Sequence, residues 1–169
     1  MNKYLLEIGT EELPYKFVNT GLVQLKSAFE QLLKDNHINY TGVKAFSTPR
    51  RLTLILEGFE EKQPDTVKVV KGPILNIAYD ENGNLSKAGQ GFARKNGVDE
   101  SALYKEDNYI WAKVEQKGKS IKDILQNNIE NLVLKMQGPY FMRWADLDVK
   151  FQRPIRWVVS LLNDEELKI

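Results

Sequence analysis

The sequence contains no cysteine and only one histidine, His37, among its 169 residues. The absence of cysteine excludes disulfides, thiolate catalysis and the usual structural zinc sites. A single histidine excludes metal sites built from several histidines, and a His-dependent catalytic triad would have to use His37 itself. We expect no metal site, and we expect His37 to be a surface residue near the C-terminal turn of the first predicted helix.

The chain also lacks an excess of charge of either sign and any long apolar run. Lys and Arg number 24 against 23 Asp and Glu, so RNA or membrane binding would need a local basic patch. No apolar run approaches the ~20 residues of a membrane span. Residues 1–14 carry acidic groups where a signal peptide would be basic and then apolar. We therefore expect a cytoplasmic protein with no membrane partner.

What is present is the composition of a globular protein, with 42% hydrophobic and 28% charged residues. An apolar face at three- and four-residue spacing predicts a helix from Pro14 to about Leu33, and a capping-box-like Ser120–Asp123 begins a second long helix. A short helix is expected to end at Asn96-Gly97. Alternating, β-branched and aromatic segments predict strands at residues 3–8, 43–48, 51–59, 66–72, 108–118 and 154–162.

These elements predict an α+β fold with short mixed or antiparallel sheets packed with two longer helices. We expect two subdomains, residues 1–60 and residues 61–169, because "EEKQPD" at residues 60–65 is a polar connection. The second subdomain is expected to be truncated at its C-terminal end, because "NDEELKI" contains no stop signal or helix cap.

Two glycine-containing motifs resemble nucleotide-binding loops without matching them. "KGKS" at residues 117–120 has Lys113 where a phosphate-binding loop needs its first glycine, so a turn and helix N-cap at Ser120 is the better interpretation. "GQGFAR" at residues 89–94 places Arg94 where a dinucleotide fingerprint needs its third glycine. The second segment is instead a basic turn and helix, either a solvated helix end or a phosphate contact.

The adjacent carboxylates Glu11 and Glu12 in "LLEIGTEELP" suggest an acid/base pair, but their spacing argues against one. Neighbouring side chains point about 100° apart on a helix and to opposite faces on a strand, so the two cannot easily converge on one site. We expect them to lie in the first helical turn, where negative charge complements the helix dipole, with Thr10 capping free N–H groups. No catalytic residue is predicted.

The arginines are concentrated in a few places, whereas the eighteen lysines are spread along the chain. Arginine at selected positions indicates a need for its planar, five-donor fork, and two arginines each precede a tryptophan. Phosphate contacts combined with base stacking favour RNA, while packing against tryptophan or pairing with Asp146 and Asp148 is an equal alternative. The nucleic-acid-binding candidates are Arg50, Arg51, Arg94, Lys95, Arg143, Arg153 and Arg156, with Trp144 and Trp157 as stacking groups.

Six segments together resemble the N-terminal part of the bacterial glycyl-tRNA synthetase β subunit. The match runs from about Leu5 to Leu162, and the six segments in register are specific where any one alone would be weak. In order they are "LLEIGTEELP", "STPRRL", "KGP", "SKAGQGFARKNGV", "MRW" and "RPIRWVVSLL".

The resemblance implies an aminoacyl-tRNA synthetase of α2β2 composition, acting on tRNA(Gly) in protein biosynthesis. It places glycine activation with ATP and Mg in the separate α subunit, so this chain would carry no cofactor and be inactive alone. The family's β subunit is several times longer and has an HD-type domain and a C-terminal anticodon-binding domain, so the chain is expected to be an N-terminal fragment.

Three functional hypotheses remain. The first is a region that supports tRNA(Gly) binding in the α/β complex, and the second is an assembly domain whose arginines form internal salt bridges. An exposed basic patch would favour the first, and arginines set against Glu and Asp the second. The third, a carboxylate-dependent hydrolase using Glu11 or Glu12, is remote.

Overall fold

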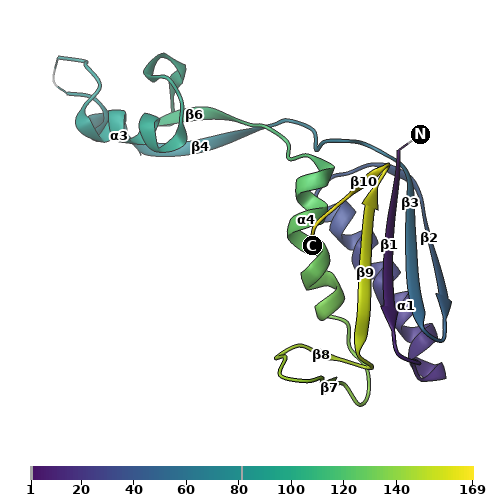
Figure 1. The fold of residues 1–169 in the computed structure, drawn as a ribbon. Coiled ribbons are helices and arrows are strands. Elements are labelled where there is room, and N and C mark those ends of the chain that lie inside the picture. Colours follow the sequence, from purple (N-terminus) through teal and green to yellow (C-terminus); the bar gives the residue numbers. More distant parts are fainter. Residues whose placement is uncertain (1, 81) are drawn as a thin grey trace. The chain divides into compact units, whose positions relative to one another are not determined.

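The computed structural model describes residues 2–80 and 82–169, and it has an α+β fold with helices packed on antiparallel sheets. The chain divides into two compact units (Figure 1). The first contains the residues up to Gln63 together with Lys119–Ile169, and the second contains Pro64–Gly118. None of the described helices is both long and apolar enough to cross a membrane.

This division differs from the predicted subdomains, residues 1–60 and residues 61–169. The first boundary lies close to the predicted one, but Lys119–Ile169 returns to the first unit because β9 (Ile155–Leu162) pairs with β1 (Lys3–Thr10). A pairing between strands at opposite ends of the chain leaves no local signal in the sequence. The second unit is therefore an insertion in the first.

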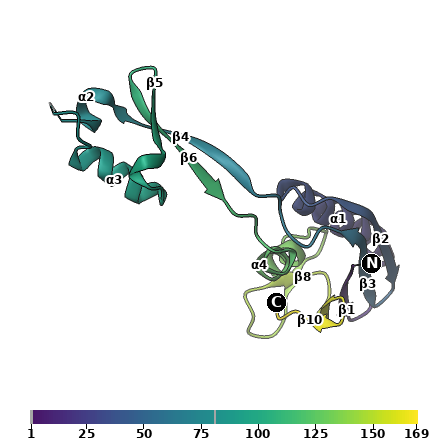
Figure 2. The same cartoon turned by 90° about the horizontal axis from the view of Figure 1, so that it is seen from above.

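The first unit is built on a five-stranded sheet in the order β10-β9-β1-β3-β2. Two helices, α1 (Tyr15–Asp35) and α4 (Ile121–Leu134), lie on the same side of this sheet (Figure 2). Within the unit the succession β-α-β-β-α-β is the ferredoxin-like arrangement. The remaining strands of the sheet are β2 (Tyr40–Thr48), β3 (Arg51–Phe59) and β10 (Glu165–Glu166).

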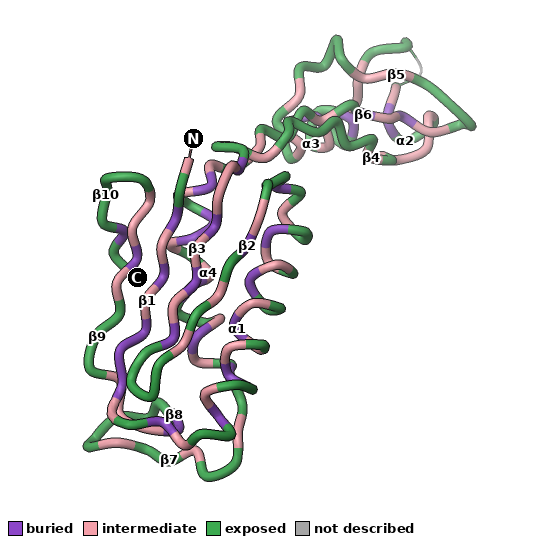
Figure 3. The backbone as a smooth tube through the Cα atoms, turned by 90° about the vertical axis from the view of Figure 1, so that its right-hand side faces the viewer, coloured by how far each residue is buried: buried purple, intermediate pink, exposed green. Residues whose placement is uncertain are grey.

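The core lies between this sheet and the two helices. Burial alternates along β1 and β3 (Figure 3). Because strand side chains alternate, every second one faces the helices and the others face the open side of the sheet. The Tyr4 ring stacks on Phe29 at 5.7 Å between centroids, and its hydroxyl hydrogen-bonds Ser160 at 2.8 Å. Burial raises the pKa of the Tyr4 phenol well above its ordinary value.

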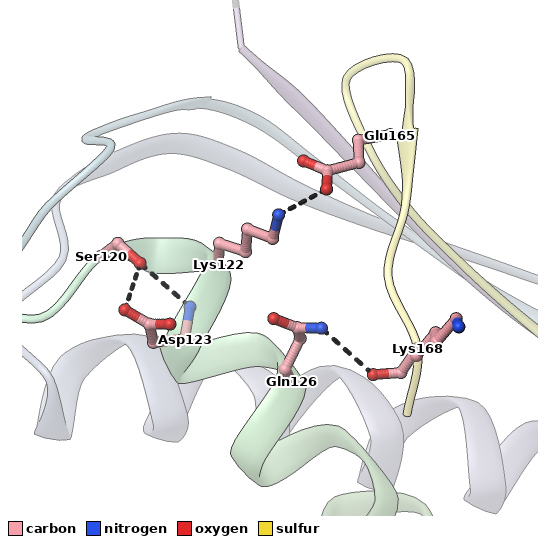
Figure 4. Close-up of polar contacts among 6 residues, drawn as sticks. All are labelled: Ser120, Lys122, Asp123, Gln126, Glu165 and Lys168. Carbon is pink, nitrogen blue, oxygen red and sulfur yellow. Dashed lines mark hydrogen bonds and ion pairs between the residues drawn. The ribbon is translucent and has the colours of Figure 1, made fainter.

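Helix α4 begins as the sequence predicts and also holds the C-terminal segment. Ser120 Oγ accepts a hydrogen bond from the backbone N–H of Asp123 at 3.1 Å and donates to its carboxylate at 2.6 Å. The Lys122 ammonium pairs with Glu165, and Gln126 Nε2 donates to the carbonyl of Lys168 at 3.4 Å (Figure 4). At the end of α1, His37 is exposed with φ 52°, which confirms its expected place.

The second unit has a three-stranded antiparallel sheet in the order β4-β6-β5. Helix α3 (Lys87–Asn96) ends at Gly97, at φ 64°, as the sequence predicts, and the Ser86 hydroxyl caps its N-terminus, which was not predicted from the sequence. Gly89 in "GQGFAR" serves packing, because a Cβ there would lie 2.6 Å from the carbonyl oxygen of Ala78. The elements are β4 (Thr66–Ile74), α2 (Leu75–Ala78), α3 (Lys87–Asn96), η1 (Glu100–Ala102), β5 (Leu103–Glu106) and β6 (Tyr109–Gln116).

The insertion of the second unit predicts that the first folds without it. The chain leaves and re-enters the first unit at neighbouring points, where Gln63 N donates to Lys119 O at 2.9 Å and Ile121 N to Glu61 O at 2.8 Å. Replacing Pro64–Gly118 with a short Gly-Ser linker should therefore leave cooperative thermal unfolding, measured by circular dichroism. Loss of the cooperative transition would show that the first unit depends on the insertion.

Candidate nucleic-acid interface

Four of the candidate arginines gather at one end of the five-stranded sheet. Segment 9–13 lies between the segment that carries Arg50 and Arg51 and the segment that carries Arg153 and Arg156. Thr10 N donates to Arg50 O at 2.9 Å on one side, and Glu11 N donates to Pro154 O at 3.1 Å on the other. Leu13 N adds a bond to Pro49 O at 2.6 Å. We call this site the arginine corner; it comprises Arg50, Arg51, Arg153, Arg156, Trp157, Glu7, Glu11 and Glu12.

Three carboxylates of the arginine corner contact three of its arginines. Arg51 Nη1 lies 3.4 Å from Glu7 Oε2, and Arg156 Nε lies 3.4 Å from Glu11 Oε1. Arg50 Nη2 is 4.0 Å from Glu12 Oε2, with both side chains about two-thirds exposed. Exposed ion pairs at such distances are screened by water and salt and contribute little stability. The arginine corner is therefore neither a bare basic patch nor a set of buried salt bridges.

Glu7 organises the open face of the sheet beside these pairs. Its Oε1 accepts the indole N–H of Trp157 at 3.0 Å while Oε2 contacts Arg51, and the Arg51 guanidinium lies 5.7 Å from the centroid of the Trp157 ring. Trp157 pairs with Gly9 across β1 and β9, and a Cβ on Gly9 would come within 1.9 Å of the ring. The glycine of "LLEIGTEELP" is therefore required for the tryptophan to lie flat on the strand.

Strict alternation in β9 would place Arg156 and Trp157 on opposite faces. The register shifts between Gly9 and Thr10, which pair with Trp157 and Ile155, so Arg156 is the extra residue of a β-bulge. A bulge turns a side chain away from the regular pleat and is common beside functional sites. Both residues are exposed as a result, and Arg156 reaches Glu11.

Arg153 holds backbone in place. Its Nε donates to the carbonyl of Glu12 at 3.2 Å and its Nη1 donates to the carbonyl of Gln152 at 3.2 Å. These bonds fasten segment 9–13 to the start of β9, so Arg153 positions the other arginines of the corner.

The expected helix-capping role of residues 10–12 is wrong. Helix α1 begins at Tyr15 after Pro14, with no acidic residue in its first turn and no side-chain cap. Thr10 is buried at the end of β1, and its hydroxyl has no hydrogen-bond partner among the described residues. Backbone hydrogen bonds from Glu11 N to Pro154 O and from Leu13 N to Pro49 O hold the segment after β1 outside the helix, and the two glutamates contact different arginines.

The remaining candidates lie elsewhere. Arg143 is in β7 (Met142–Arg143), which pairs with β8 (Lys150–Phe151), and its Nη2 is 3.9 Å from Asp148 Oδ1. The Trp144 indole N–H donates to the carbonyl of Phe151 at 3.0 Å, so that ring stabilises the hairpin. Arg94 and Lys95 are exposed in the last turn of α3, in the second unit.

Sequence reasoning missed Glu7, which contacts both Arg51 and Trp157. A signal was present, because Glu7 is the one charged residue inside the apolar run "LLEI" and alternates with the buried Leu6 and Ile8. An outward-facing acid on a central strand indicates a cross-strand partner.

Comparison with known proteins gives one consistent result. Residues 4–169 match the family described as glycyl-tRNA synthetase beta subunit. The chain is 40% identical to the glycine–tRNA ligase beta subunit of Clostridioides difficile over 173 residues, covering 99% of this chain and 25% of that protein. The corresponding protein of Lactobacillus acidophilus is 42% identical, covering 98% of this chain and 25% of its own length. The chain thus spans about a quarter of the curated relatives that it matches.

The contact between Gly9 and Trp157 predicts that Gly9→Ala destabilises the chain by about 1–3 kcal/mol, because the added methyl group displaces the ring. Gly42→Ala in β2 is the matched control, since a Cβ there meets nothing within 4 Å. Urea denaturation of both variants measures the difference. The loss should shrink when Trp157→Leu is combined with Gly9→Ala, and equal stability of the two alanine variants would contradict the contact.

Proposed function

The chain belongs to the glycyl-tRNA synthetase beta subunit family, and on this premise we propose that it supports tRNA(Gly) binding during the ATP-dependent attachment of glycine to tRNA. The observation that carries the proposal is the arginine corner, where guanidinium groups from separate segments of the chain meet at one exposed end of a sheet. Guanidinium forks match phosphate oxygens in geometry and charge.

The ion pairs of the arginine corner support this role because they are exchangeable. Arg50 and Arg156 are each more than 60% exposed, and each contacts a carboxylate that is itself accessible. A tRNA phosphate could replace Glu12 or Glu11 at these groups at small cost, since an exposed pair stabilises the fold little. We assign the phosphate contacts to Arg50 and Arg156.

The other members of the corner have different roles in this proposal. Glu7 and Arg51 fix the Trp157 ring on β1, and Arg153 fixes the backbone that carries Glu12. The Trp157 side chain remains 41% exposed, so a base or ribose can contact its uncovered edge. Arg94, Lys95 and Arg143 are secondary phosphate contacts in the same scheme.

We assign catalysis to the α subunit and not to this chain. We place the ATP and Mg²⁺ of the reaction at the α subunit of an α2β2 complex in the cytoplasm, so this chain alone would be inactive. A hydrolase using Glu11 and Glu12 is not proposed, because the two carboxylates contact different arginines, Arg156 and Arg50.

A second candidate, an assembly domain without RNA contact, is favoured by one observation. The segment around β7 and β8 exposes four apolar side chains, and two residues, Tyr140 and Ala145, adopt positive φ there. Exposed apolar side chains on a strained segment are typical of a protein interface. The four are Tyr140, Met142, Leu147 and Val149.

The proposal predicts that Arg50→Gln/Arg156→Gln weakens binding of tRNA(Gly) about tenfold at low salt. The slope of log K against log salt should fall by about one for each phosphate that an arginine no longer neutralises. The measurement is fluorescence anisotropy of labelled tRNA(Gly) and an unrelated tRNA over a salt series.

Lys16→Gln/Lys34→Gln is the matched control, because it removes the same charge from exposed positions of α1. An equal decrease in affinity in the two double variants would show that the effect comes from the lost net charge and not from the arginine corner. Unchanged binding by the arginine variant would exclude the arginine corner and favour the assembly domain.

A further inference from the structure

The sheet of the second unit carries a row of lysine and aromatic side chains on one face. Across the strands, Lys71 pairs with Trp111, and Trp111 pairs with Tyr104. Two residues away along β6 in either direction lie Tyr109 and Lys113, on the same face because strand side chains alternate. We call these five residues the lysine-aromatic face: Lys71, Tyr104, Tyr109, Trp111 and Lys113.

The opposite face of this sheet is occupied by the unit's own core. Ile110 and Ala112 are buried there, and a Cβ on Gly72 would meet Ile110 and Phe92 of α3 at under 3 Å. Helices α2 and α3 lie together in the same part of the second unit (Figure 2). The packing of the second unit therefore uses one face of the sheet and leaves the lysine-aromatic face outward.

The lysines of the lysine-aromatic face lie against its rings. Lys71 Nζ is 3.5 Å from the centroid of Tyr109 and 5.8 Å from that of Trp111, and Lys113 Nζ is 5.8 Å from that of Tyr104. The three rings are only partly buried and both lysines are exposed. The Trp111 indole N–H donates to the carbonyl of Glu106 at 2.9 Å, which fixes the plane of that ring.

The surroundings indicate a ligand with both flat and anionic parts. Val67 and Val69 on β4 extend the face and are 60% and 49% exposed. Acidic residues on the same face of the sheet lie at its two ends: Glu106 pairs with Tyr109, and Glu115 pairs with Val67. The lysines and rings therefore occupy the centre of the face. Ammonium groups interleaved with fixed aromatic rings suit phosphates joined to stacked bases better than an apolar protein surface.

We propose that the lysine-aromatic face binds unpaired RNA nucleotides, with Trp111 and Tyr109 or Tyr104 stacking bases and with Lys71 and Lys113 contacting phosphates. The inference rests on the proposed function in taking RNA as the ligand, but it assigns a separate surface on a separate unit. A cation on an exposed ring is held more weakly than a base stacks, so each lysine can leave its ring for a phosphate as a base arrives.

The first test is the affinity of the chain for single-stranded oligouridylate. Lys71→Gln/Lys113→Gln should weaken this binding about tenfold. The matched control Lys87→Gln/Lys105→Gln removes the same charge from the second unit outside the lysine-aromatic face and should bind like the unaltered chain. Equal effects of the two pairs, or no effect of the first, would overturn the inference.

The second test reports on stacking. Trp111 is one of three tryptophans, and oligouridylate should quench fluorescence in the unaltered chain and in Trp144→Phe, with most of the quenching lost in Trp111→Phe. A fully paired RNA hairpin should quench far less than the single strand. Quenching that persists in Trp111→Phe would overturn the stacking assignment, and circular dichroism of each variant confirms that it is folded.

Arg50→Gln/Arg156→Gln, assayed in parallel, separates this inference from the proposed function. If the arginine pair weakens tRNA(Gly) binding while the lysine pair binds oligouridylate normally, the inference fails and the proposed function stands. If only the lysine pair matters, the arginine corner fails and the inference stands. If the lysine pair leaves RNA binding unchanged but weakens association with the purified α subunit, the face is a protein interface and the inference is overturned.

Discussion

The hydrogen bonding of β1 on both of its edges is the constraint on which the rest of the first unit depends. β1 pairs with β3 on one side and with β9 on the other, from Tyr4 to Gly9. These pairings join strands from both ends of the chain into one sheet, and one face of that sheet packs on the buried core. They also bring the start of β3 and the start of β9 to the end of β1, which is where the arginine corner forms. The corner is thus a consequence of the sheet order.

The chemistry of the arginine corner follows from how unevenly its groups are held. Arg153 donates to two carbonyl oxygens, and Arg51 is fixed by Glu7 and by the Trp157 ring. Arg50 and Arg156 contact accessible carboxylates at 4.0 and 3.4 Å. Two arginines therefore maintain the geometry, and the proposed function assigns exchange of carboxylate for phosphate to the other two. The adjacent glutamates Glu11 and Glu12 do not converge on one site; each contacts a different arginine and partly neutralises the corner.

Local sequence signals predicted the individual helices and strands, but they did not predict how distant strands pair. The apolar spacing of α1, the Ser120 cap and the strand at residues 51–59 each follow from a few neighbouring residues, and the structure confirms them. The insertion of the second unit, the bulge at Arg156 and the contact of Trp157 with Gly9 depend on strands far apart in sequence. The arginines could be singled out, and so could Asp148 as a partner, which contacts Arg143, but pairing with Glu7, Glu11 and Glu12 could not.

The most direct test of the central claim is an electron cryomicroscopy structure of the complete synthetase with tRNA(Gly) bound. We expect the guanidinium groups of Arg50 and Arg156 within about 3 Å of tRNA phosphate oxygens, displaced from Glu12 and Glu11, with Arg51 still on Trp157. A map in which both arginines keep their carboxylates, and the end of the sheet faces protein, would contradict this expectation and identify the domain as an assembly element.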